Sequence, residues 1–451
     1  MNAIVSPPRR RGACPGLAAP MATGDGLLTR LATGGATIGL DAATALCAAA
    51  RRHGNGIIEV TARGSIQVRG LTAASAPAFA AAVSALDIDA GDRVPILTDP
   101  LAGLAPDQTI DATDLATALR QRLAATSFAA MLGPKVSVVL DGGSALHLDA
   151  VPADIRLRAA SEPAGWQVSL GGDTGSATLL GAVAAEHTLE LAARLLETIA
   201  RHGQQARAKA LIERHGTCVF RAAVADLLIA GPPLPPRPPA DPIGLHPLRD
   251  GRLGLGIGLA FGHTDAQAFE RLIEAAARFG AACLRTAPGR ALLFIGVTAA
   301  AARDLAAHAE SLGFITRRND PRRHVVACAG APICASAEIP ARALAPLISD
   351  AAALLLDGSL TVHISGCRKG CAHPGVSALT IVGTQGGCGL IVDACARDQP
   401  IAIVAATALP AALERIAQTA AGAHQPGDTT ADTLARLDAA QLAQTFGTAH
   451  G

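Results

Sequence analysis

The sequence predicts an α+β protein with internal pseudo-twofold symmetry, in which two ferredoxin-like halves are each followed by an α/β core domain. Two observations support this fold class. The segment 27–71 aligns with 253–297 at a constant offset and without a gap, and a proline-rich segment separates the two copies near the middle of the chain. Because a duplicated unit packs against its copy, we expect strands of both copies to join in one sheet or barrel.

Each copy follows the pattern of half a ferredoxin-like unit. An apolar strand leads into a helix that begins near Asp41 or Asp265, and Gly54 or Gly280 ends that helix. A second, longer strand and a further helix follow. The expected regions are a ferredoxin-like half over 1–90, an α/β core over 91–230, a proline-rich linker over 231–243, a second half over 244–311 and a second core over 312–451.

The composition limits the classes of function. The chain has 451 residues, which is too many for a single core. With 38 basic and 37 acidic residues, and 2% aromatic residues without a tyrosine, it lacks the basic and stacking surfaces that nucleic acids need. Its alanine-rich apolar runs fall short of the roughly 18 residues of a membrane span. We therefore expect neither a nucleic-acid nor a membrane partner, and a cytoplasmic protein whose reducing surroundings keep thiolates available as ligands.

The second strand of the first copy alternates strictly between polar and apolar residues. Its polar face comprises Glu59, Thr61, Arg63, Ser65, Gln67 and Arg69. A solvated outer face would explain this pattern. In the second copy, however, the positions of Arg63, Gln67 and Arg69 hold glycine, leucine and isoleucine. Only one half has kept the polar face, which favours an asymmetric ligand site near the pseudo-twofold axis, with these three residues as candidate substrate ligands.

Four cysteines in the last third of the chain form two pairs. Five residues separate Cys328 from Cys334, and three separate Cys367 from Cys371. A 4Fe-4S cluster needs four thiolates that converge on one cube, and two short loops can supply them. Zinc is the usual alternative, but its structural sites prefer pairs separated by two to four residues, so the wider first pair favours the cluster without excluding zinc.

The remaining cysteines and several basic residues are less specific. Cys47, Cys218 and Cys283 are interpreted as small buried hydrophobic residues, and the roles of Cys14, Cys388 and Cys395 are left open. Further candidate substrate ligands are Arg93, Lys135, Arg368 and Lys369. The last two lie between two cluster cysteines, where they could offset the charge of the cluster or bind a carboxylated ligand.

These motifs resemble the siroheme-dependent nitrite and sulfite reductase family over nearly the whole chain. They are GACPGL at 12–17 running into PMATGDGLL at 20–28, TARGSIQ at 61–67, and the two cysteine loops, of which HISGCRKGCAHP at 363–374 is the most specific. The family's fold has two ferredoxin-like halves around a pseudo-twofold axis, each followed by an α/β core, with a tetrapyrrole between them. The resemblance is greatest to the branch that serves aerobic cobalamin biosynthesis.

The resemblance implies roles for single residues. In the reductases, the cysteine that Cys371 matches joins the cluster to siroheme iron. Arg63 and Arg93 match arginines that face the substrate or siroheme, and Lys135 matches the first of two active-site lysines. Ser137 stands where the second lysine would be. Because reduction of sulfite needs repeated proton donation, this departure disfavours reductase activity.

For the cobalamin branch, the resemblance implies the substrate precorrin-3A, a carboxylate-rich macrocycle that would occupy the pocket siroheme fills in the reductases. Siroheme itself is then not expected. The implied reaction is that of a monooxygenase, an O2-dependent hydroxylation at the meso carbon between rings A and D, with the ring A acetate closing a γ-lactone. Electrons would come from an external donor, a separate reductase or ferredoxin, by way of the 4Fe-4S cluster.

The resemblance also implies a mononuclear non-haem iron, for which two histidines and a carboxylate would be the natural ligands. His147 and Asp149 place two candidates on one side of an expected strand, and His363 and His373 flank the cluster loops. Because an exposed alternating strand gives the same pattern, no iron ligand is assigned. Two other functions stay open. One is a siroheme-dependent sulfite or nitrite reductase, and the other is a non-enzymatic iron-sulfur electron carrier or redox sensor. The carrier or sensor would need no large polar pocket.

Overall fold

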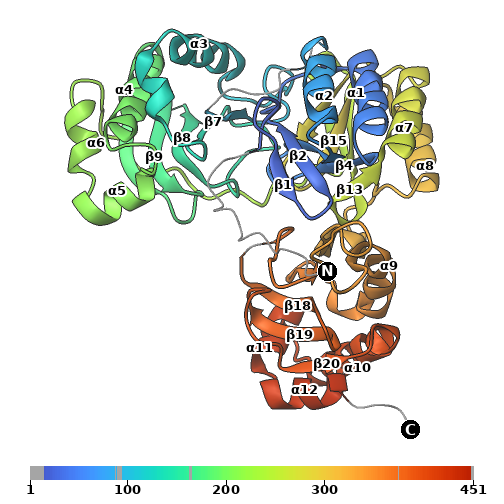
Figure 1. The fold of residues 1–451 in the computed structure, drawn as a ribbon. Coiled ribbons are helices and arrows are strands. Elements are labelled where there is room, and N and C mark those ends of the chain that lie inside the picture. Colours follow the sequence, from blue (N-terminus) through green and yellow to red (C-terminus); the bar gives the residue numbers. More distant parts are fainter. Residues whose placement is uncertain (1–14, 87, 89–93, 162–164, 374, 448–451) are drawn as a thin grey trace.

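The chain folds into three lobes. The computed structural model describes residues 15–86, 88, 94–161, 165–373 and 375–447, so Arg93 and Cys14 lie outside the described residues. Figure 1 shows the two ferredoxin-like halves packed together, in blue and in yellow, with the first core in green beside them and the second core in orange and red below. None of the described helices is long and apolar enough to cross a membrane.

Each half contains a five-stranded sheet and two helices. The first sheet has the order β1-β2-β5-β4-β13 and the second the order β11-β12-β15-β14-β3. The strands of the first half are β1 (Met21–Thr23), β2 (Gly26–Leu31), β3 (Ile38–Gly39), β4 (Ile57–Val60) and β5 (Ile66–Leu71). Those of the second are β11 (Gly244–Pro247), β12 (Leu253–Gly258), β13 (His263–Asp265), β14 (Cys283–Ala287) and β15 (Ala291–Val297).

The two halves exchange their shortest strands. Strand β13 of the second half pairs with β4 of the first, and β3 of the first half pairs with β14 of the second. The expected joining of strands into one sheet or barrel is therefore corrected to two sheets, each completed by a strand from the other half. The reason is geometric, since only β3 and β13 reach across the pseudo-twofold axis, and both immediately precede the first helix of their own half.

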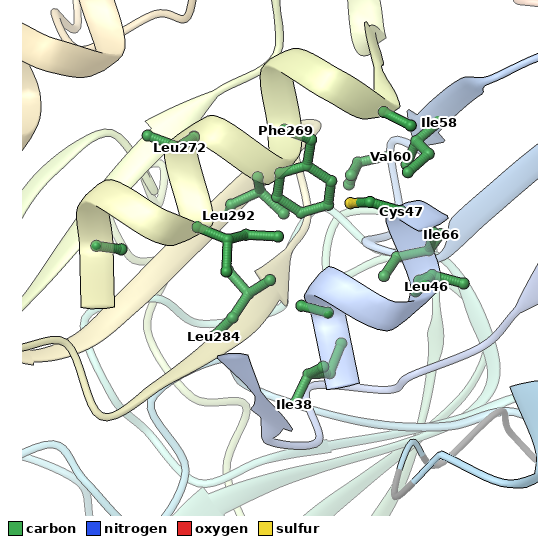
Figure 2. Close-up of a cluster of buried hydrophobic side chains, with 14 of the residues drawn as sticks. Ile38, Leu46, Cys47, Ile58, Val60, Ile66, Phe269, Leu272, Leu284 and Leu292 are labelled. Atoms are coloured by element: carbon green, nitrogen blue, oxygen red, sulfur yellow. The ribbon is translucent and has the colours of Figure 1, made fainter. Parts of the chain in front are cut away.

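A single hydrophobic core lies between the halves. Helices α1 (Leu40–His53) and α7 (Ala266–Arg278) pack against each other, with α2 (Ser75–Ser84) and α8 (Ala299–Ser311) beside them. Figure 2 shows Leu46, Cys47 and Ile58 of the first half facing Phe269 and Leu292 of the second. Because burial of apolar area is the main favourable term in folding, this shared core fixes the two halves as one unit.

The long strand expected over 58–69 is a hairpin. Strands β4 and β5 run antiparallel, and the Thr61 N–H donates to the Ser65 carbonyl across the turn. Gly64 at the turn has φ +81°, which a residue with a side chain adopts at a cost. The polar residues still share one face of the sheet, because Glu59 of β4 pairs with Gln67 of β5 across the hairpin.

The tips of the two equivalent hairpins meet at the pseudo-twofold axis. The Gly289 N–H donates to the Ala62 carbonyl at 3.0 Å, and the hydroxyls of Thr33 and Thr286 lie 2.7 Å apart. The second half lost its polar face for a packing reason, because Leu293 and Ile295 are buried against residues of the first core and the linker.

The two core domains have the same topology. The first sheet has the order β6-β7-β8-β9-β10 and the second β16-β17-β18-β19-β20, with the first three strands parallel and the last two antiparallel in both. The strands of the first core are β6 (Ile96–Thr98), β7 (Val138–Asp141), β8 (Ala153–Ala160), β9 (Gly165–Gly172) and β10 (Thr178–Ala184). Those of the second are β16 (Val325–Ala327), β17 (Val362–Ser365), β18 (Ser377–Thr384), β19 (Gly387–Ala394) and β20 (Ala402–Val404).

Helices cover these two sheets and bury a separate apolar cluster in each core. The first core has α3 (Thr113–Ala124), α4 (Thr188–Arg201), α5 (Ala208–His215) and α6 (Cys218–Ala223). The second has α9 (Ala341–Ala351), α10 (Leu409–Ala423), α11 (Thr430–Arg436) and α12 (Ala439–Gly447). Short 3-10 turns occur at Ser127–Met131, Ala185–His187, Ala260–Gly262, Pro321–His324, Ala353–Leu355 and Ala406–Ala408.

Candidate functional site

The four paired cysteines lie on two loops at one edge of the second core sheet. Cys328 follows β16 directly, and Cys367 follows β17 after one glycine. Because β16 and β17 are parallel neighbours, their carboxyl ends place these loops side by side. Cys334 lies further along the first loop and Cys371 at the end of the second, so the fold brings both pairs to the same edge.

Glycines let the backbone approach the cysteine sulfurs closely. The Gly366 N–H donates to the Cys328 sulfur at 3.0 Å. A Cβ atom on Gly24 would lie 2.2 Å from the Cys334 sulfur, and one on Gly330, which has φ +68°, would lie 2.3 Å from the Ala341 nitrogen. N–H groups aimed at thiolate and sulfide sulfur tune an iron-sulfur cluster, so these loops suit such a group.

The spacing of the sulfurs favours a cluster over zinc. A tetrahedral zinc with Zn–S bonds of about 2.3 Å would hold its thiolates within about 4 Å of one another. Among the described cysteines, no three have sulfurs within 4.8 Å of one another. A cubane binds each thiolate through a different iron and so needs the wider spacing. Cys328, Cys334, Cys367 and Cys371 therefore fit a 4Fe-4S cluster as its ligands.

The polar face of the first half lies against the second core. Glu59 is its centre, 3.4 Å from Arg69 on one side and 3.4 Å from Arg342 of α9 on the other. The β1–β2 loop also contacts the Cys334 loop, where the Ala335 N–H donates to the Gly24 carbonyl. The outer face of this sheet is thus an internal boundary beside the cysteines rather than a solvated surface.

Arg69 and Gln67 of this face bind protein groups. Arg69 donates to Asp25 at 2.7 and 2.8 Å. Burial alone would raise the pKa of Asp25, but the hydrogen bonds and charge of Arg69 hold it below its usual value. The buried Gln67 amide lies between the Arg30 guanidinium and the Glu59 carboxylate, at 2.6 and 3.0 Å.

The other candidate substrate ligands are dispersed. Arg63 is exposed at the tip of the first hairpin, and Lys135 is exposed on the loop before β7. Arg368 donates to the Arg397 carbonyl, and Lys369 donates to Ser336 at 2.7 Å, which ties the two cysteine loops together. The structure therefore groups Gln67 and Arg69 beside the cysteine loops, whereas Lys135 belongs to the first core.

Three further polar residues at this boundary were not singled out from the sequence. Arg342 has two buried guanidinium nitrogens, Nε and Nη1, without a hydrogen-bond partner among the described residues. The Nδ1 atom of His263, next to Glu59 in the sheet, also lacks one. Arg290, at the tip of the second hairpin, is half-buried and has φ +63°. Arg290 and Arg342 lie in segments otherwise dominated by alanine and leucine, and nothing in their spacing marks them.

His363 lies in β17 beneath the cluster loops and is fully buried. Neither ring nitrogen has a hydrogen-bond partner among the described residues. Burial, with the nearby His373 and Arg290, lowers its pKa to about 4. The imidazole is thus neutral at pH 7 and has an unused donor and an unused acceptor.

His147 and Asp149 do not fit a mononuclear iron. Both lie in the loop after β7 rather than on a strand, and their ligand atoms and one of Asp141 lie within 4.8 Å of one another. The Arg237 guanidinium from the linker bonds both carboxylates, at 2.5 Å to Asp141 and 2.6 Å to Asp149. His147 also contacts the Pro238 carbonyl at 2.8 Å. A cation of the protein already holds these oxygens, which leaves no free carboxylate ligand for an iron ion here.

The other cysteines are partly as expected. Cys47 is fully buried, and burial raises its pKa to about 12, whereas Cys218 is exposed and Cys283 half-buried. The interpretation as buried residues is therefore correct for Cys47 and wrong for Cys218, which lies at the start of α6 on the surface of the first core. Cys388 is buried in β19, where burial raises its pKa to about 11.

Comparison with known proteins identifies the family. The nitrite/sulfite reductase ferredoxin-like half domain matches residues 19–86, and the nitrite and sulphite reductase 4Fe-4S domain matches residues 91–228. A precorrin-3B synthase from a Sinorhizobium species is 40% identical over 97% of this chain and 95% of its own length. The chain belongs to the family that unites precorrin-3B synthase with the nitrite and sulfite reductases.

A more distant relative and a solved structure extend the comparison. A ferredoxin–nitrite reductase of Synechococcus elongatus is 26% identical over 73% of this chain and 70% of its own length. The solved structure of Mycobacterium tuberculosis NirA superposes with a TM-score of 0.74 at 20% identity, covering 92% of this chain and 84% of that one. The predicted fold class, with its two ferredoxin-like halves and α/β cores, is thereby confirmed.

The matched 4Fe-4S domain is the first core, yet the paired cysteines are in the second. Between residues 91 and 228 the only cysteine is Cys218. The identical strand order shows the second core to be another copy of the same domain. Membership of the family supports an iron-sulfur cluster, and in this chain only the second copy offers two cysteine pairs.

Proposed function

We propose that this chain is a precorrin-3B synthase, which hydroxylates precorrin-3A at the meso carbon between rings A and D with formation of a γ-lactone from the ring A acetate. The observation that supports this most is the 40% identity with a protein of that name over nearly the entire chain. The structure adds a polar face that lies against the candidate cluster loops.

The proposed reaction is that of a monooxygenase. One atom of O2 enters the macrocycle, and the other is reduced to water by an electron pair and protons that come from an external donor. When bound at Cys328, Cys334, Cys367 and Cys371, a 4Fe-4S cluster supplies electrons singly. The chain's own residues bind and orient the macrocycle, and Arg63, Gln67, Arg69, Arg93, Lys135, Arg368 and Lys369 are the residues proposed for this from the sequence.

The structure supports dividing these residues by role. Gln67 and Arg69 are bonded to Arg30, Glu59 and Asp25, so we infer that they hold the polar face in shape. Arg368 and Lys369 bond to the loops around the cysteines and would fix those loops. Arg63, exposed at the hairpin tip, is the residue of this set that we propose to contact a carboxylate directly.

A siroheme-dependent reductase is the second candidate, and one residue disfavours it. Ser137 occupies the position of the second active-site lysine of the reductases, and it is buried, with its N–H bonded to Asp154 at 3.1 Å. A buried serine cannot replace an ammonium group as a proton donor. The carrier or sensor alternative needs no polar boundary beside the cysteines, and the charged groups around Glu59 count against it.

The proposal is tested by aerobic incubation of the purified protein with precorrin-3A and a reductant under labelled O2. We expect the product to gain one labelled oxygen atom, as measured by mass spectrometry, and the gain to require both O2 and reductant. A protein that leaves precorrin-3A unchanged but reduces sulfite or nitrite would instead be a reductase. Siroheme in the purified protein, visible in its absorption spectrum, would point the same way.

A further inference from the structure

The boundary between the first half and the second core contains hydrogen-bonding groups that the protein itself leaves unpaired. Arg342 reaches Glu59 through Nη2 at 3.4 Å, while its Nε and Nη1 atoms are buried without a partner among the described residues. A buried donor without an acceptor destabilises the folded protein, and a charged donor does so more strongly. A buried guanidinium with two such donors therefore indicates an acceptor that comes from a ligand.

His263 faces the same space. It lies beside Glu59 in the sheet, and its Nδ1 atom is also unpaired among the described residues. Burial, with the charges of Arg342 and Arg69, lowers its pKa to about 3, so the ring is neutral at pH 7. A neutral imidazole carries a single N–H, so His263 donates to an anion from Nδ1 in the tautomer that has its proton there, with Nε2 as the acceptor.

Arg290 adds a third group from the second half. Its side chain folds over Gly262, whose Cβ, if present, would lie 2.7 Å from the Arg290 Cδ. Arg290 and Gly262 line one narrow cleft together with Phe261, and the charge of Glu59 acts on Arg290. No hydrogen bond or ion pair to the Arg290 guanidinium occurs among the described residues.

The charges in this place do not balance. Among its described members, the guanidinium groups of Arg69, Arg290 and Arg342, together with that of Arg30 on Gln67, outnumber the two carboxylates of Asp25 and Glu59. Arg69 already satisfies Asp25 and shares Glu59 with Arg342. The positive charge left over lies on the two arginines whose donors are unpaired, and an incoming anion would neutralise it.

We propose that Arg342, His263 and Arg290 form a carboxylate-binding site for one acid side chain of the macrocyclic substrate, at the boundary between the hairpin tips and the second core. This inference rests on the proposed function and assigns to the bound macrocycle three residues that no sequence motif indicated. A carboxylate fits because planar guanidinium groups bind it with directional hydrogen bonds, and because the groups come from both halves, the site would also fix the orientation of the ring.

The competing source of negative charge is the cluster itself, since the charge of Cys328 also acts on Arg342. The charges that act on His263 and Arg290 are instead those of Arg342, Arg69 and Glu59. Cysteines are not among the charges that act on His263 and Arg290, which favours the substrate, while Arg290 also acts on His363 beneath the cluster loops. The test distinguishes the two sources.

The test is an anaerobic titration of the holoprotein with precorrin-3A, followed by its fluorescence or absorbance. We expect Arg342→Gln to weaken binding about ten- to hundredfold, the equivalent of losing charged hydrogen bonds, while iron and sulfide content are unchanged. Arg342→Lys should recover part of the affinity because it keeps the charge. The matched control is Arg201→Gln, an exposed arginine paired with Glu197 on α4, which should bind as the unaltered protein does.

A second variant guards against misfolding of the first. Arg290→Gln keeps a polar side chain at the tip of the second hairpin but removes its charge, and we expect a severalfold loss of affinity. Unchanged binding by both variants would overturn the inference, as would a shifted cluster potential with unchanged affinity, which would assign Arg342 to the cluster. Binding by neither the unaltered protein nor any variant would overturn the proposed function and this inference with it.

Discussion

The two core domains share one fold, and the same backbone hydrogen bond holds a different side chain in each. At the end of the first strand of the second core, the Gly366 N–H donates to the Cys328 sulfur at 3.0 Å. At the equivalent place in the first core, the Gly142 N–H donates to Asp99 Oδ2 at 3.3 Å. The fold thus supplies the side chain at this place with a backbone donor in both domains, and the residue type decides whether the place suits iron.

The largest effect is expected from the cysteines themselves. Cys334→Ser or Cys367→Ser should abolish the cluster absorbance and the oxygenation together, because a cubane that lacks one thiolate loses a ligand of one iron. Iron, acid-labile sulfide and product formation are the measurements. Cys218→Ser in the first core is the matched control and should retain all three. A variant of Cys367 that kept both cluster and activity would contradict the ligand assignment.

The stability of the first core should depend on the Arg237 guanidinium, which pairs with two of its carboxylates. Arg237→Ala leaves Asp141 buried and Asp149 half-buried without their partner, and removal of one member of a buried ion pair costs about 3–5 kcal/mol. We expect the free energy of unfolding, measured with denaturant, to fall by that order while iron content per folded protein is unchanged. The exposed Arg201→Ala should change it by less than about 0.5 kcal/mol. An equal decrease in the free energy of unfolding in both variants would show that the Arg237 ion pairs stabilise the protein no more than an exposed pair does.

Asp99 should make the stability of the first core depend on pH in the acidic range, where the Cys328 thiol of the second core does not titrate. Burial, with the charge of Asp141, raises the pKa of Asp99 to about 6. The folded state then holds a proton that the unfolded chain has already lost above about pH 4, so stability falls as pH rises from about 4 to about 6. Asp99→Asn should remove about 2–3 kcal/mol of that fall.

The measurement is the free energy of unfolding of both proteins from pH 4 to pH 8. Asp99→Asn is expected to be at its largest disadvantage at pH 4 and to gain on the unaltered protein up to about pH 6. Parallel curves for the two proteins would mean that Asp99 keeps an ordinary pKa in the folded state.

The smallest effect is expected at His147. Because Arg237 already binds the neighbouring carboxylates, His147→Ala should leave iron content unchanged and cost the hydrogen bonds of its ring with the Pro238 carbonyl and the Asp149 N–H, about 1–2 kcal/mol. Iron analysis of the holoprotein and its denaturation midpoint are sufficient. Loss of one iron per chain with the cluster spectrum intact would restore His147 as a metal ligand and contradict the role assigned to Arg237.

The sequence sufficed for features that repeat or cluster along the chain. The offset copies predicted the paired halves, and the spacing of the cysteines predicted a loop pair that the fold brings to one edge. Strands β3 and β13 escaped notice because two and three residues are too few to show a period. The sequence pattern predicted one long strand in place of the hairpin. Polar and apolar residues alternate in the same phase in β4 and β5, so the turn between them does not interrupt the pattern.

The site residues of the boundary could not have been found in this way. Arg342 lies in the first turn of α9, where a single arginine in a helix is ordinarily solvated, and only tertiary packing buries its nitrogens. Arg290 is offset by one residue from the position that aligns with Arg63, so the repeat alignment suggested that the second tip had lost its charge. The equivalence of Asp99 and Cys328 likewise becomes visible only when strand order is compared.

The borrowed edge strands bear on how such a molecule could have arisen from a shorter precursor. A single copy of the repeat would have a sheet that lacks its edge strand. It would also have one short segment, equivalent to β3 or β13, with no strand to pair with. Two identical copies would fill both vacancies by trading those segments, as in a domain-swapped dimer. Fusion of the genes would then keep the partners together, after which one core was free to specialise in thiolates and the other in carboxylates.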